Sequence, residues 1–476
     1  MDDLKFSNSI QEGFATTNSP LARDLLSQDT RPLPHALSAV GNHRPEMRPI
    51  PFSTYYDPEY AALELEYVWK KCWQFACREE DIQSIGDRYV YDVGPLSFII
   101  VKTSNNSFKA FYNSCLHRGT RLCNHEGGGN QIRCPFHGWS WNVDGSICNI
   151  PGQWDFPNVD AEYRLPEAKI ECWGGCIFIN PDLNSAPLVD ALGILPAHFA
   201  HFDLAERFTL VRTAKKVRAN WKTVWAAFLE AYHVAETHFD ATGFNGDANT
   251  QYDCFDNGKS VISRLITPSA VPSPTLGDTV SARDAAIEAV MSFAEAFGPD
   301  ASATIPDFEN THEFGRSDVA AWRRQIMQKM LGADCGDLSD SEMIDSIQYA
   351  MFPNFGPWLG EGLPLMYQFL PYGNNPDESL FVVRLMAPLS PGSPRPPAAT
   401  MLTLDFDEPF SSLPQWGRAA HIFDQDMSNL PIIQQGMKHA SPQIANLTLG
   451  RYQEQRIQLM HNFVDQMIER ECNKTE

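Results

Sequence analysis

The sequence has no long hydrophobic run and little positive charge. Its densest apolar stretch, residues 98–101, is far shorter than the ~20 residues needed to cross a bilayer. The first ten residues, MDDLKFSNSI, lack the apolar core of a secretory signal, so we expect a cytoplasmic protein. Lys and Arg number 37 against 59 Asp and Glu, and the net charge of -22 would repel nucleic acid and anionic membranes. We therefore expect neither as a partner.

Two further absences limit the chemistry. The chain has no G-x-G-x-x-G motif and no P-loop, so it is not expected to oxidise NAD(P)H itself and needs a separate reductase or ferredoxin. The 11 cysteines are odd in number and scattered, which argues against a disulfide framework. Attention therefore turns to metal and redox chemistry.

The predicted fold class is α+β, with a small all-β domain ahead of a larger domain of antiparallel sheet and helices. Residues 1–50 are polar and contain several prolines, which predicts an arm that wraps a neighbour or is partly disordered. Residues 51–80 are predicted to form a helical segment that packs on the larger domain. Short β-rich runs fill residues 81–180. After a linker over 181–200, the larger domain takes residues 201–476.

Periodicity predicts individual elements within these domains. Helical spacing covers residues 57–73 and 221–237, and apolar residues recur at helical spacing over 457–468. Two strand-like runs, 365–370 and 380–385, flank a turn-rich segment and predict an antiparallel hairpin. In the small domain, strands are expected at 89–91, 97–101, 110–112 and 176–179.

Two mixed pairs of cysteine and histidine stand in the small domain. They are Cys115-Leu-His117 and Cys134-Pro-Phe-His137. A zinc finger usually couples Cys with Cys and His with His, whereas a two-iron cluster with thiolates on one iron and imidazoles on the other needs one ligand of each kind from each loop. The spacing therefore predicts a Rieske [2Fe-2S] cluster. A zinc site, or chance placement of core residues, is the alternative.

A second motif, Glu230-x2-His233-x4-His238, follows in the larger domain. On an unbroken helix the two histidines would lie about 140° apart, so both can face one metal only if the helix distorts or ends between them. Two imidazoles and one carboxylate form the facial triad of non-haem Fe(II) enzymes. The best downstream source of the carboxylate is the run Phe423-Asp-Gln-Asp426. Taken singly, each histidine is more typical of a hydrogen-bonded core or surface position than of a metal ligand.

In this order, over residues 51–436, the motifs resemble the oxygenase α subunit of a Rieske non-haem iron oxygenase, the aromatic-ring-hydroxylating dioxygenase family. The resemblance implies a helix-grip catalytic domain around an apolar pocket. It also implies a head-to-tail α3 homo-oligomer, with or without a β subunit. Finally, it implies that the [2Fe-2S] cluster is held by Cys115, His117, Cys134 and His137, and the mononuclear Fe(II) by His233, His238 and Asp426.

The resemblance further makes Glu230 a catalytic residue. It implies that this carboxylate bonds His233 and also reaches His137 of the partner subunit. Many family members have Asp at the position of Glu230, and many ring dihydroxylases have Glu-Asn where this chain has Trp225-Ala226. No substrate is therefore transferred from any one subgroup.

The predicted function is that of a terminal oxygenase. It would activate O2 and hydroxylate a hydrophobic substrate, aromatic or polycyclic, by dihydroxylation or monooxygenation. The alternatives are an electron-transfer protein in which only the Rieske domain works, and a helix-grip module that binds hydrophobic ligands without iron. Aromatic residues predicted to line the pocket are Trp225, Phe228, Phe239, Phe352, Phe355 and Trp358.

Overall fold

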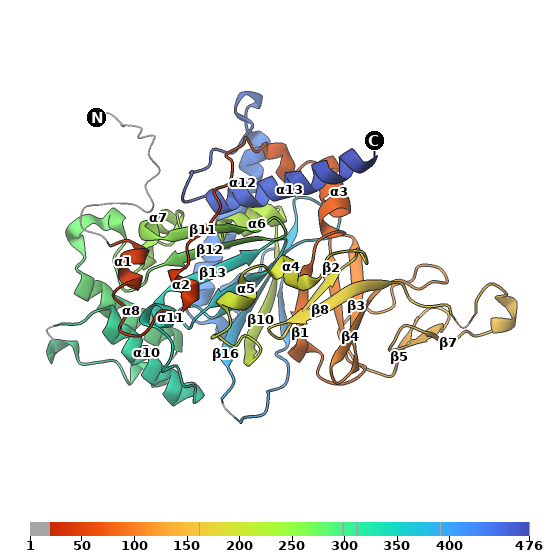
Figure 1. Cartoon of the computed structure of the whole chain (residues 1–476), viewed down its shortest axis with the longest axis horizontal. Helices are drawn as coiled ribbons and strands as arrows, with labels where there is room; N and C mark the ends of the chain where they lie inside the picture. The colour runs from red at the N-terminus through yellow and green to blue at the C-terminus, as the bar shows by residue number, and fades with distance from the viewer. Residues whose placement is uncertain (1–19, 161, 298, 311–312, 391, 476) are drawn as a thin grey trace.

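The chain consists of a narrow arm and a larger body (Figure 1). The computed structural model describes residues 20–475 apart from 161, 298, 311–312 and 391. The arm contains a six-stranded and a three-stranded sheet, and the body contains an eight-stranded sheet with helices packed on it. These features confirm the predicted α+β class, with a small β domain ahead of a larger mixed domain.

The six-stranded sheet is antiparallel throughout, in the order β1-β9-β8-β4-β3-β2. The strands predicted at 89–91, 97–101, 110–112 and 176–179 are confirmed as parts of β2, β3, β4 and β9. Strand β1, the first in the chain, is formed by residues that we predicted to belong to the helical segment 51–80. The strands are β1 (Gln74–Arg78), β2 (Arg88–Val93), β3 (Leu96–Ser104), β4 (Ser107–Tyr112), β8 (Glu167–Trp173) and β9 (Cys176–Asn180).

Strand β3 explains the densest apolar run of the sequence. Successive side chains of a strand point to opposite faces. Phe98 and Ile100 belong to a core shared with the body, whereas Ile99 and Val101 belong to the core beneath the tip of the arm. Both faces are covered, so the run carries no polar residues. The tip holds the three-stranded sheet of β5 (Gln131–Arg133), β6 (Ser140–Asn142) and β7 (Ile147–Asn149).

The eight-stranded sheet of the body has the order β11-β12-β13-β14-β15-β16-β10-β17. All neighbouring pairs are antiparallel except β10 and β17, which are parallel. The predicted hairpin is confirmed as the pair β15–β16. The strands are β10 (Arg207–Val217), β11 (Gln251–Asp256), β12 (Val261–Thr267), β13 (Ser346–Met351), β14 (Gly356–Leu359), β15 (Leu365–Pro371), β16 (Ser379–Pro388) and β17 (Met401–Leu404).

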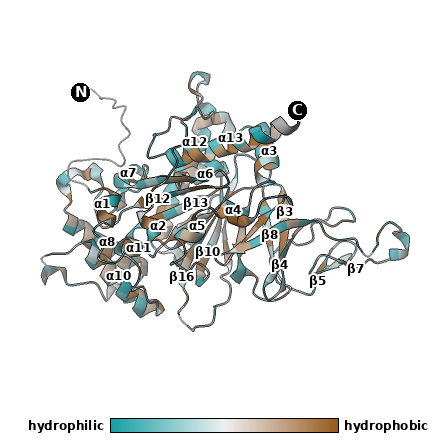
Figure 2. Cartoon of the chain, viewed as in Figure 1, coloured by the Kyte–Doolittle hydropathy of each residue, from teal (hydrophilic) through white to brown (hydrophobic). Residues whose placement is uncertain are grey.

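Three helices share the main hydrophobic core with this sheet: α6 (Trp221–Ala227), α12 (Ala419–His439) and α13 (Gln455–Thr475). The last confirms the predicted C-terminal amphipathic helix, because Met460 and Val464 are buried against the core. Figure 2 shows brown, apolar residues along the strands at the centre of the body and teal residues at the end of the arm. Within the described residues, each helix is too short or too polar to serve as a membrane span.

The N-terminal segment packs on this chain from residue 20 onward. Its helices α1 (Ala22–Leu26) and α2 (His35–Ser38) lie against the body (Figure 1). Leu25 and Leu37 are buried, although their spacing is too sparse to reveal a period in the sequence. Residues 20–50 therefore pack on their own chain, while residues 1–19 of the predicted arm lie outside the described residues.

Several helices occur where the sequence predicts none. The predicted linker, 181–200, contains α4 (Leu188–Leu192) and α5 (Leu195–His198). By contrast, the helix predicted over 57–73 is confirmed in part by α3 (Pro58–Glu64), which Asp57 caps through the Glu59 N–H group. Between β12 and β13 lie α8 (Ala282–Phe297), α9 (Pro299–Ser302), α10 (Arg316–Leu331) and α11 (Asp340–Ile344).

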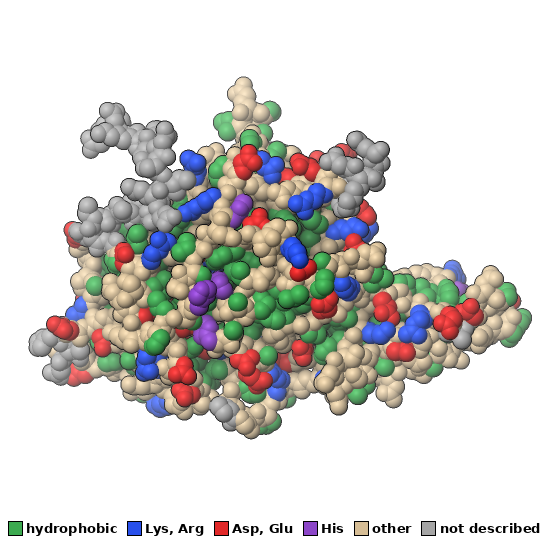
Figure 3. All heavy atoms as spheres, in the orientation of Figure 1, with side chains coloured by type: hydrophobic (Ala, Val, Ile, Leu, Met, Phe, Trp, Pro, Cys, Tyr) green, Lys and Arg blue, Asp and Glu red, His purple; other side chains and the backbone are tan. Residues whose placement is uncertain are grey.

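Buried charges join the arm to the body. Asp81, between β1 and β2, lies 3.0 Å from Arg212 of β10 and 2.6 Å from Arg384 of β16. Arg212 also contacts Glu126 of the arm at 2.7 Å. Burial alone would raise the pKa of Asp81, but the two guanidinium groups outweigh it and lower this pKa below its usual value. Figure 3 shows acidic and basic side chains interspersed where the arm meets the body.

Candidate metal centres

Two loops of the same shape lie at the tip of the arm. In each loop, the cysteine carbonyl accepts a hydrogen bond from the N–H group of the glycine four residues later. The pairs are Cys115 with Gly119 and Cys134 with Gly138. The cysteine N–H donates to the carbonyl of the residue after that glycine, at 2.8 Å in both loops. The glycines have left-handed φ values of 76° and 77°, which residues with a Cβ rarely adopt. Two separate stretches therefore form matching turns.

The loops sort their four candidate ligands by type. The Cys115 and Cys134 thiols are buried and contact each other. The His117 and His137 rings lie with their centroids 4.7 Å apart. Thiols paired with thiols and imidazoles with imidazoles fit a cluster in which one iron takes two thiolates and the other two imidazoles. The arrangement supports the predicted ligand set.

Hydrogen bonding prepares the cysteines to act as ligands. Burial opposes charge on the Cys134 thiol, but backbone N–H groups of its own loop donate to the sulfur and lower the pKa of Cys134 overall. Cys115 receives similar N–H groups, although burial still raises its pKa. The His117 ring stacks on Trp139 with centroids 5.0 Å apart. The thiols lie inside and the imidazoles lie toward solvent.

The chain that leads to the two candidate iron histidines is not one continuous helix. The continuous helix over 221–237 is wrong, because α6 ends at Ala227 and only a single turn, α7 (Val234–Thr237), follows. His233 and His238 flank that turn, and the backbone of His238 has left the helical region. An unbroken helix would separate the imidazoles by about 140°. The break brings their ring centroids to 5.1 Å.

Asp426 of α12 completes the group. Its Oδ1 lies 3.0 Å from His238 Nε2 and 3.6 Å from His233 Nε2. One ligating atom from each of the three side chains lies within 4.8 Å of the others. Two atoms about 2.1 Å from an ion and at right angles to each other lie about 3.0 Å apart, so this spacing fits one metal ion. The donor set of two imidazoles and one carboxylate suits non-haem Fe(II) with open positions.

The Nδ1 atom of each imidazole, on the side away from Asp426, forms a hydrogen bond with a neighbouring side chain. His233 Nδ1 lies 2.7 Å from Glu230 Oε1, and His238 Nδ1 lies 2.8 Å from Gln425 Oε1. Each Nδ1 can donate to its acceptor, which leaves Nε2 for a metal. Burial opposes charge on His233, but Glu230 and Asp426 outweigh it and raise the pKa of His233 to about 9. The surrounding charge therefore favours a cation.

Gln425 is a functional candidate that the sequence analysis missed. It stands immediately before Asp426 in the acidic run quoted above. A glutamine in that run carries no distinctive signal, because its contact with His238 exists only once α12 packs across α7. Glu230 was predicted to contact His233, and the structure brings the two together. Its predicted contact with His137 of the partner subunit stays a prediction.

A cavity of about 510 Å³ opens on this group of ligands and is lined by all three of them. Of the predicted pocket aromatics, Phe228 and Trp358 line it. The prediction is wrong for the other four. Phe239 is 65% exposed, and the rest are buried in the cores instead of the cavity, because strand and helix packing turns them away: Trp225, Phe352 and Phe355.

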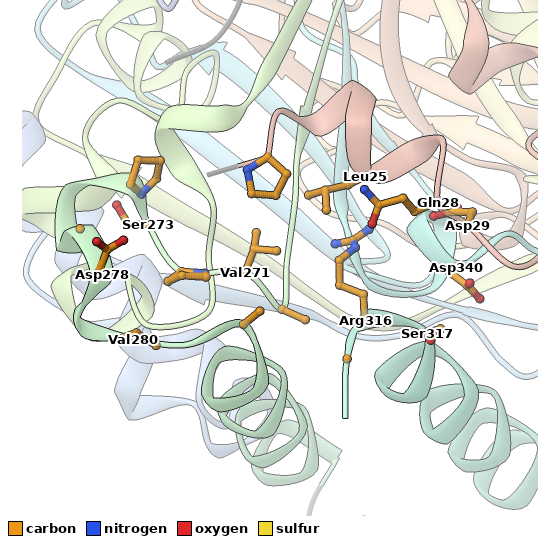
Figure 4. Close-up of a pocket in the computed structure, with 17 residues that line it drawn as sticks. Leu25, Gln28, Asp29, Val271, Ser273, Asp278, Val280, Arg316, Ser317 and Asp340 are labelled. Atoms are coloured by element: carbon orange, nitrogen blue, oxygen red, sulfur yellow. The ribbon is translucent and has the colours of Figure 1, made fainter. Parts of the chain in front are cut away.

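A second cavity, of about 530 Å³, lies between α1 and the start of α10 (Figure 4). Its charged side chains already have protein partners. Arg316 pairs with Asp345 at 2.8 Å, and Asp29 accepts hydrogen bonds from Ser341. We assign this cavity no function.

Comparisons with known families place each candidate metal centre inside a matched domain. A model of the Rieske [2Fe-2S] domain matches residues 72–160, and a model of the ring hydroxylating alpha subunit (catalytic domain) matches residues 199–470. The second match alone covers more than half of the chain. The chain belongs to the ring-hydroxylating α subunit family. The two matches imply a Rieske [2Fe-2S] cluster and a mononuclear iron, as predicted.

Curated relatives differ in the substrates that their names give. The carnitine monooxygenase oxygenase subunit of Escherichia coli is 30% identical over 198 residues, which cover 40% of this chain and 52% of that protein. The α subunit of benzene 1,2-dioxygenase from Pseudomonas putida is 30% identical over 191 residues, 38% of this chain and 42% of that protein. The chain thus spans about half the length of the curated relatives it matches.

Solved structures share the fold over a longer span. A quaternary ammonium Rieske monooxygenase in complex with L-carnitine has a TM-score of 0.59 at 16% identity, covering 88% of this chain and 95% of the other. Naphthalene 1,2-dioxygenase with indole bound has a TM-score of 0.60 at 16% identity, covering 88% and 92%. At this identity the likeness shows the fold alone.

Proposed function

We propose that the chain is the terminal oxygenase component of a Rieske system, which uses O2 and externally supplied electrons to hydroxylate an apolar small molecule. The observation that carries this proposal is the cavity of about 510 Å³ lined by His233, His238 and Asp426. When bound, the cluster supplies electrons one at a time and the mononuclear iron supplies the place where O2 meets the substrate. The cavity brings a substrate to that place.

The lining favours a substrate with an apolar, aromatic or polycyclic body. Six aromatic side chains line the cavity: Phe228, Phe244, Phe293, Trp358, Tyr367 and Phe423. Such faces bind flat rings by area and by edge-to-face contacts. The names of the relatives include both a quaternary ammonium compound and an arene. Most of the lining is apolar, and we propose the second kind. Either a diol or an alcohol can be the product.

The residues around the ligands orient the site. Glu230 and Gln425 fix which imidazole nitrogen faces inward, which sets the direction from which each histidine binds a metal. Glu230 also accepts a hydrogen bond from the His233 N–H group at 3.0 Å. The carboxylate therefore stabilises the non-helical turn that brings His233 to the site.

The electron path is proposed to cross between subunits of a homo-oligomer. In Figure 1 the tip strands β5 and β7 lie at the far right, whereas α7, beside the catalytic ligands, lies at the left of the body. A neighbouring chain's tip could supply a shorter route. The exposed His137 at the tip and the Glu230 carboxylate are the groups proposed to meet across that interface. A separate reductase or ferredoxin would reduce the exposed tip.

Product analysis tests the proposed activity. We would supply a reductase and 18O2, and offer polycyclic aromatics, aromatic acids, terpenoids and carnitine. We expect 18O in the product of an apolar compound and none in carnitine. Exclusive oxidation of carnitine would overturn the apolar substrate class. Iron analysis separates the alternatives, because about three irons per chain indicate the oxygenase, about two the electron carrier and none the ligand-binding module.

Mixed oligomers test the electron path. Chains with Cys134→Ala and chains with Asp426→Ala are each expected to be inactive alone. When they are unfolded, mixed and reassembled, or made together in one cell, activity should return, because an intact cluster then lies beside an intact iron site of another chain. Full activity of a wild-type monomer, or no recovery in verified mixed oligomers, would contradict the intersubunit path.

A further inference from the structure

One wall of the catalytic cavity is built by two neighbouring strands and carries three polar side chains beside one leucine. Leu265 of β12 pairs with Gln348 of β13. Two residues along, Thr267 pairs with Ser346. All four residues line the cavity, because alternate residues of a strand share one face. The residues between them, such as Ile266, are buried in a different core on the other side of the sheet.

Gln348 is held in one orientation on this wall. It is 1% exposed, and its Oε1 accepts a hydrogen bond from Arg456 Nη2 at 2.9 Å. A guanidinium has donors only, so the amide oxygen must face Arg456 and Nε2 must point elsewhere. Among the described residues, none accepts a hydrogen bond from Nε2, and packed protein atoms do not seal this nitrogen. A hydrogen-bond donor therefore opens on the cavity.

Arg456 is anchored so that it keeps this amide in place. Its Nε donates to Ser263 Oγ at 3.0 Å and its Nη1 donates to the Leu229 carbonyl at 3.0 Å. The side chain is 1% exposed, and no described carboxylate forms an ion pair with it. A charged donor on the amide oxygen draws electron density from the amide, which makes Nε2 a stronger donor. Leu229 immediately precedes Glu230, so the same guanidinium also braces the ligand loop.

We propose that Gln348 is a specificity-determining residue that binds an oxygen acceptor on the substrate. The preferred substrates are then apolar molecules that carry a carbonyl, hydroxyl or ether oxygen, in preference to plain hydrocarbons. A substrate tethered at β13 presents only part of its carbon frame to His233 and Asp426, which line the same cavity. This inference deepens the proposed function, on which its account of substrate class rests.

A matched pair of ligands tests this role by binding alone. We would measure the affinities of 1-tetralone and tetralin for the iron-loaded protein by calorimetry without O2 or reductant. The two bicyclic compounds differ by one carbonyl oxygen. We expect the wild type to prefer the ketone by about tenfold, as a buried hydrogen bond to a polarised donor provides.

Three variants locate that preference. Gln348→Leu removes the donor and should abolish the preference while leaving tetralin affinity unchanged. Gln348→Glu keeps the contact with Arg456 but presents an acceptor, and should also abolish it. Ser346→Ala alters the same wall, leaves the amide in place and should retain the preference. Iron content, measured in each protein, should equal that of the wild type.

Equal affinities for the two compounds in the wild type would overturn the inference. A preference for the ketone that survives in Gln348→Leu would overturn it as well. If the preference is present and lost as expected but neither compound is hydroxylated on turnover, the oxygen-binding role of Gln348 is supported and the proposed oxygenase activity fails for these compounds.

Discussion

The two candidate metal centres use histidine in opposite ways. At the tip of the arm, Cys115 and Cys134 are buried while His137 is exposed. In the body, His238 and Asp426 are buried, and the His233 side chain is 25% exposed. An exposed imidazole edge suits exchange of electrons with another protein, whereas a largely buried set of ligands suits exclusion of water from a substrate cavity.

The centres also differ in how the chain holds them. The tip loops are fixed by backbone hydrogen bonds within two short turns, so each loop carries its ligands independently. In the body, His233 and His238 flank the single helical turn α7, and Asp426 lies on a helix almost 200 residues away in sequence. The tip is therefore a local structure, and the catalytic centre depends on the packing of the whole body.

Removing a tip cysteine should have the largest effect. Cys134→Ala takes a thiolate from a cluster whose remaining ligands cannot complete both irons, so the visible colour and all turnover should vanish. His137→Ala should act alike. Absorption and electron paramagnetic resonance spectra measure the loss. Cys123→Ala, close to the same loops, is the control and should keep the cluster; an unchanged spectrum in Cys134→Ala would refute the ligand assignment.

Asp426→Ala should separate the two centres. We expect mononuclear iron and oxygenation to be lost while the cluster remains coloured and reducible, because the tip does not depend on α12. Metal analysis alongside the visible spectrum measures both. Asp424→Asn is the matched control, since Asp424 accepts hydrogen bonds from the Phe410 and Ser411 N–H groups and lies outside the ligand group. Full iron in Asp426→Ala would require another third ligand.

Glu230→Gln tests the proposed link between the centres. It should keep both metals but slow electron transfer from the reduced cluster to the mononuclear iron by about 10- to 100-fold, the range typical of changes beside a metal ligand. Single-turnover oxidation of the pre-reduced cluster, with substrate and O2 present, measures the rate. A wild-type rate would remove Glu230 from the electron path and leave it a positioning role at His233.

Asp81→Asn should affect stability and leave both centres intact. The change leaves Arg212 and Arg384 buried without their carboxylate, a loss of about 3–5 kcal/mol in the free energy of unfolding. Because the pKa of Asp81 is lowered in the folded chain, its stabilisation is fully present above the unfolded value of about 3.9 and is lost as pH falls through the folded value.

Urea unfolding at several pH values measures the Asp81 effect. The wild type should lose stability below about pH 4 more steeply than Asp81→Asn, in which this carboxyl no longer titrates. Metal content at neutral pH serves as the control and should not change. Equal stability of the two proteins at neutral pH would contradict the structural importance of the buried pairs.

Features formed by residues close together in the sequence could be predicted from it, whereas features formed by distant residues could not. The cysteine and histidine pairs of the tip are local, so their spacing alone pointed to the cluster. The choice of Asp426 came through the family resemblance, because no periodicity connects it to His233. The helix over 221–237 was wrong because amphipathic spacing does not reveal that α6 ends at Ala227.

Features that depend on packing between distant segments were not predictable. The contact of Gln425 with His238 requires α12 to cross α7, and the orientation of Gln348 requires Arg456 from the C-terminal helix. Phe239 is aromatic and was therefore predicted to line the pocket, but it is exposed. The aromatic content of the sequence predicted that an apolar cavity exists. It did not predict which side chains line that cavity, because the register of the sheet determines them.

The pairing of β9 with β1 sets the limits of any domain exchange between relatives. Strands β8 and β9 lie beyond residue 160, where the Rieske family match ends, yet they complete the six-stranded sheet and connect β4 to β1. A transplanted cassette cut at residue 160 would expose two strand edges that invite aggregation. A chimera therefore has to carry residues 74–180 as one piece, and its recipient has to supply arginines for the incoming Asp81.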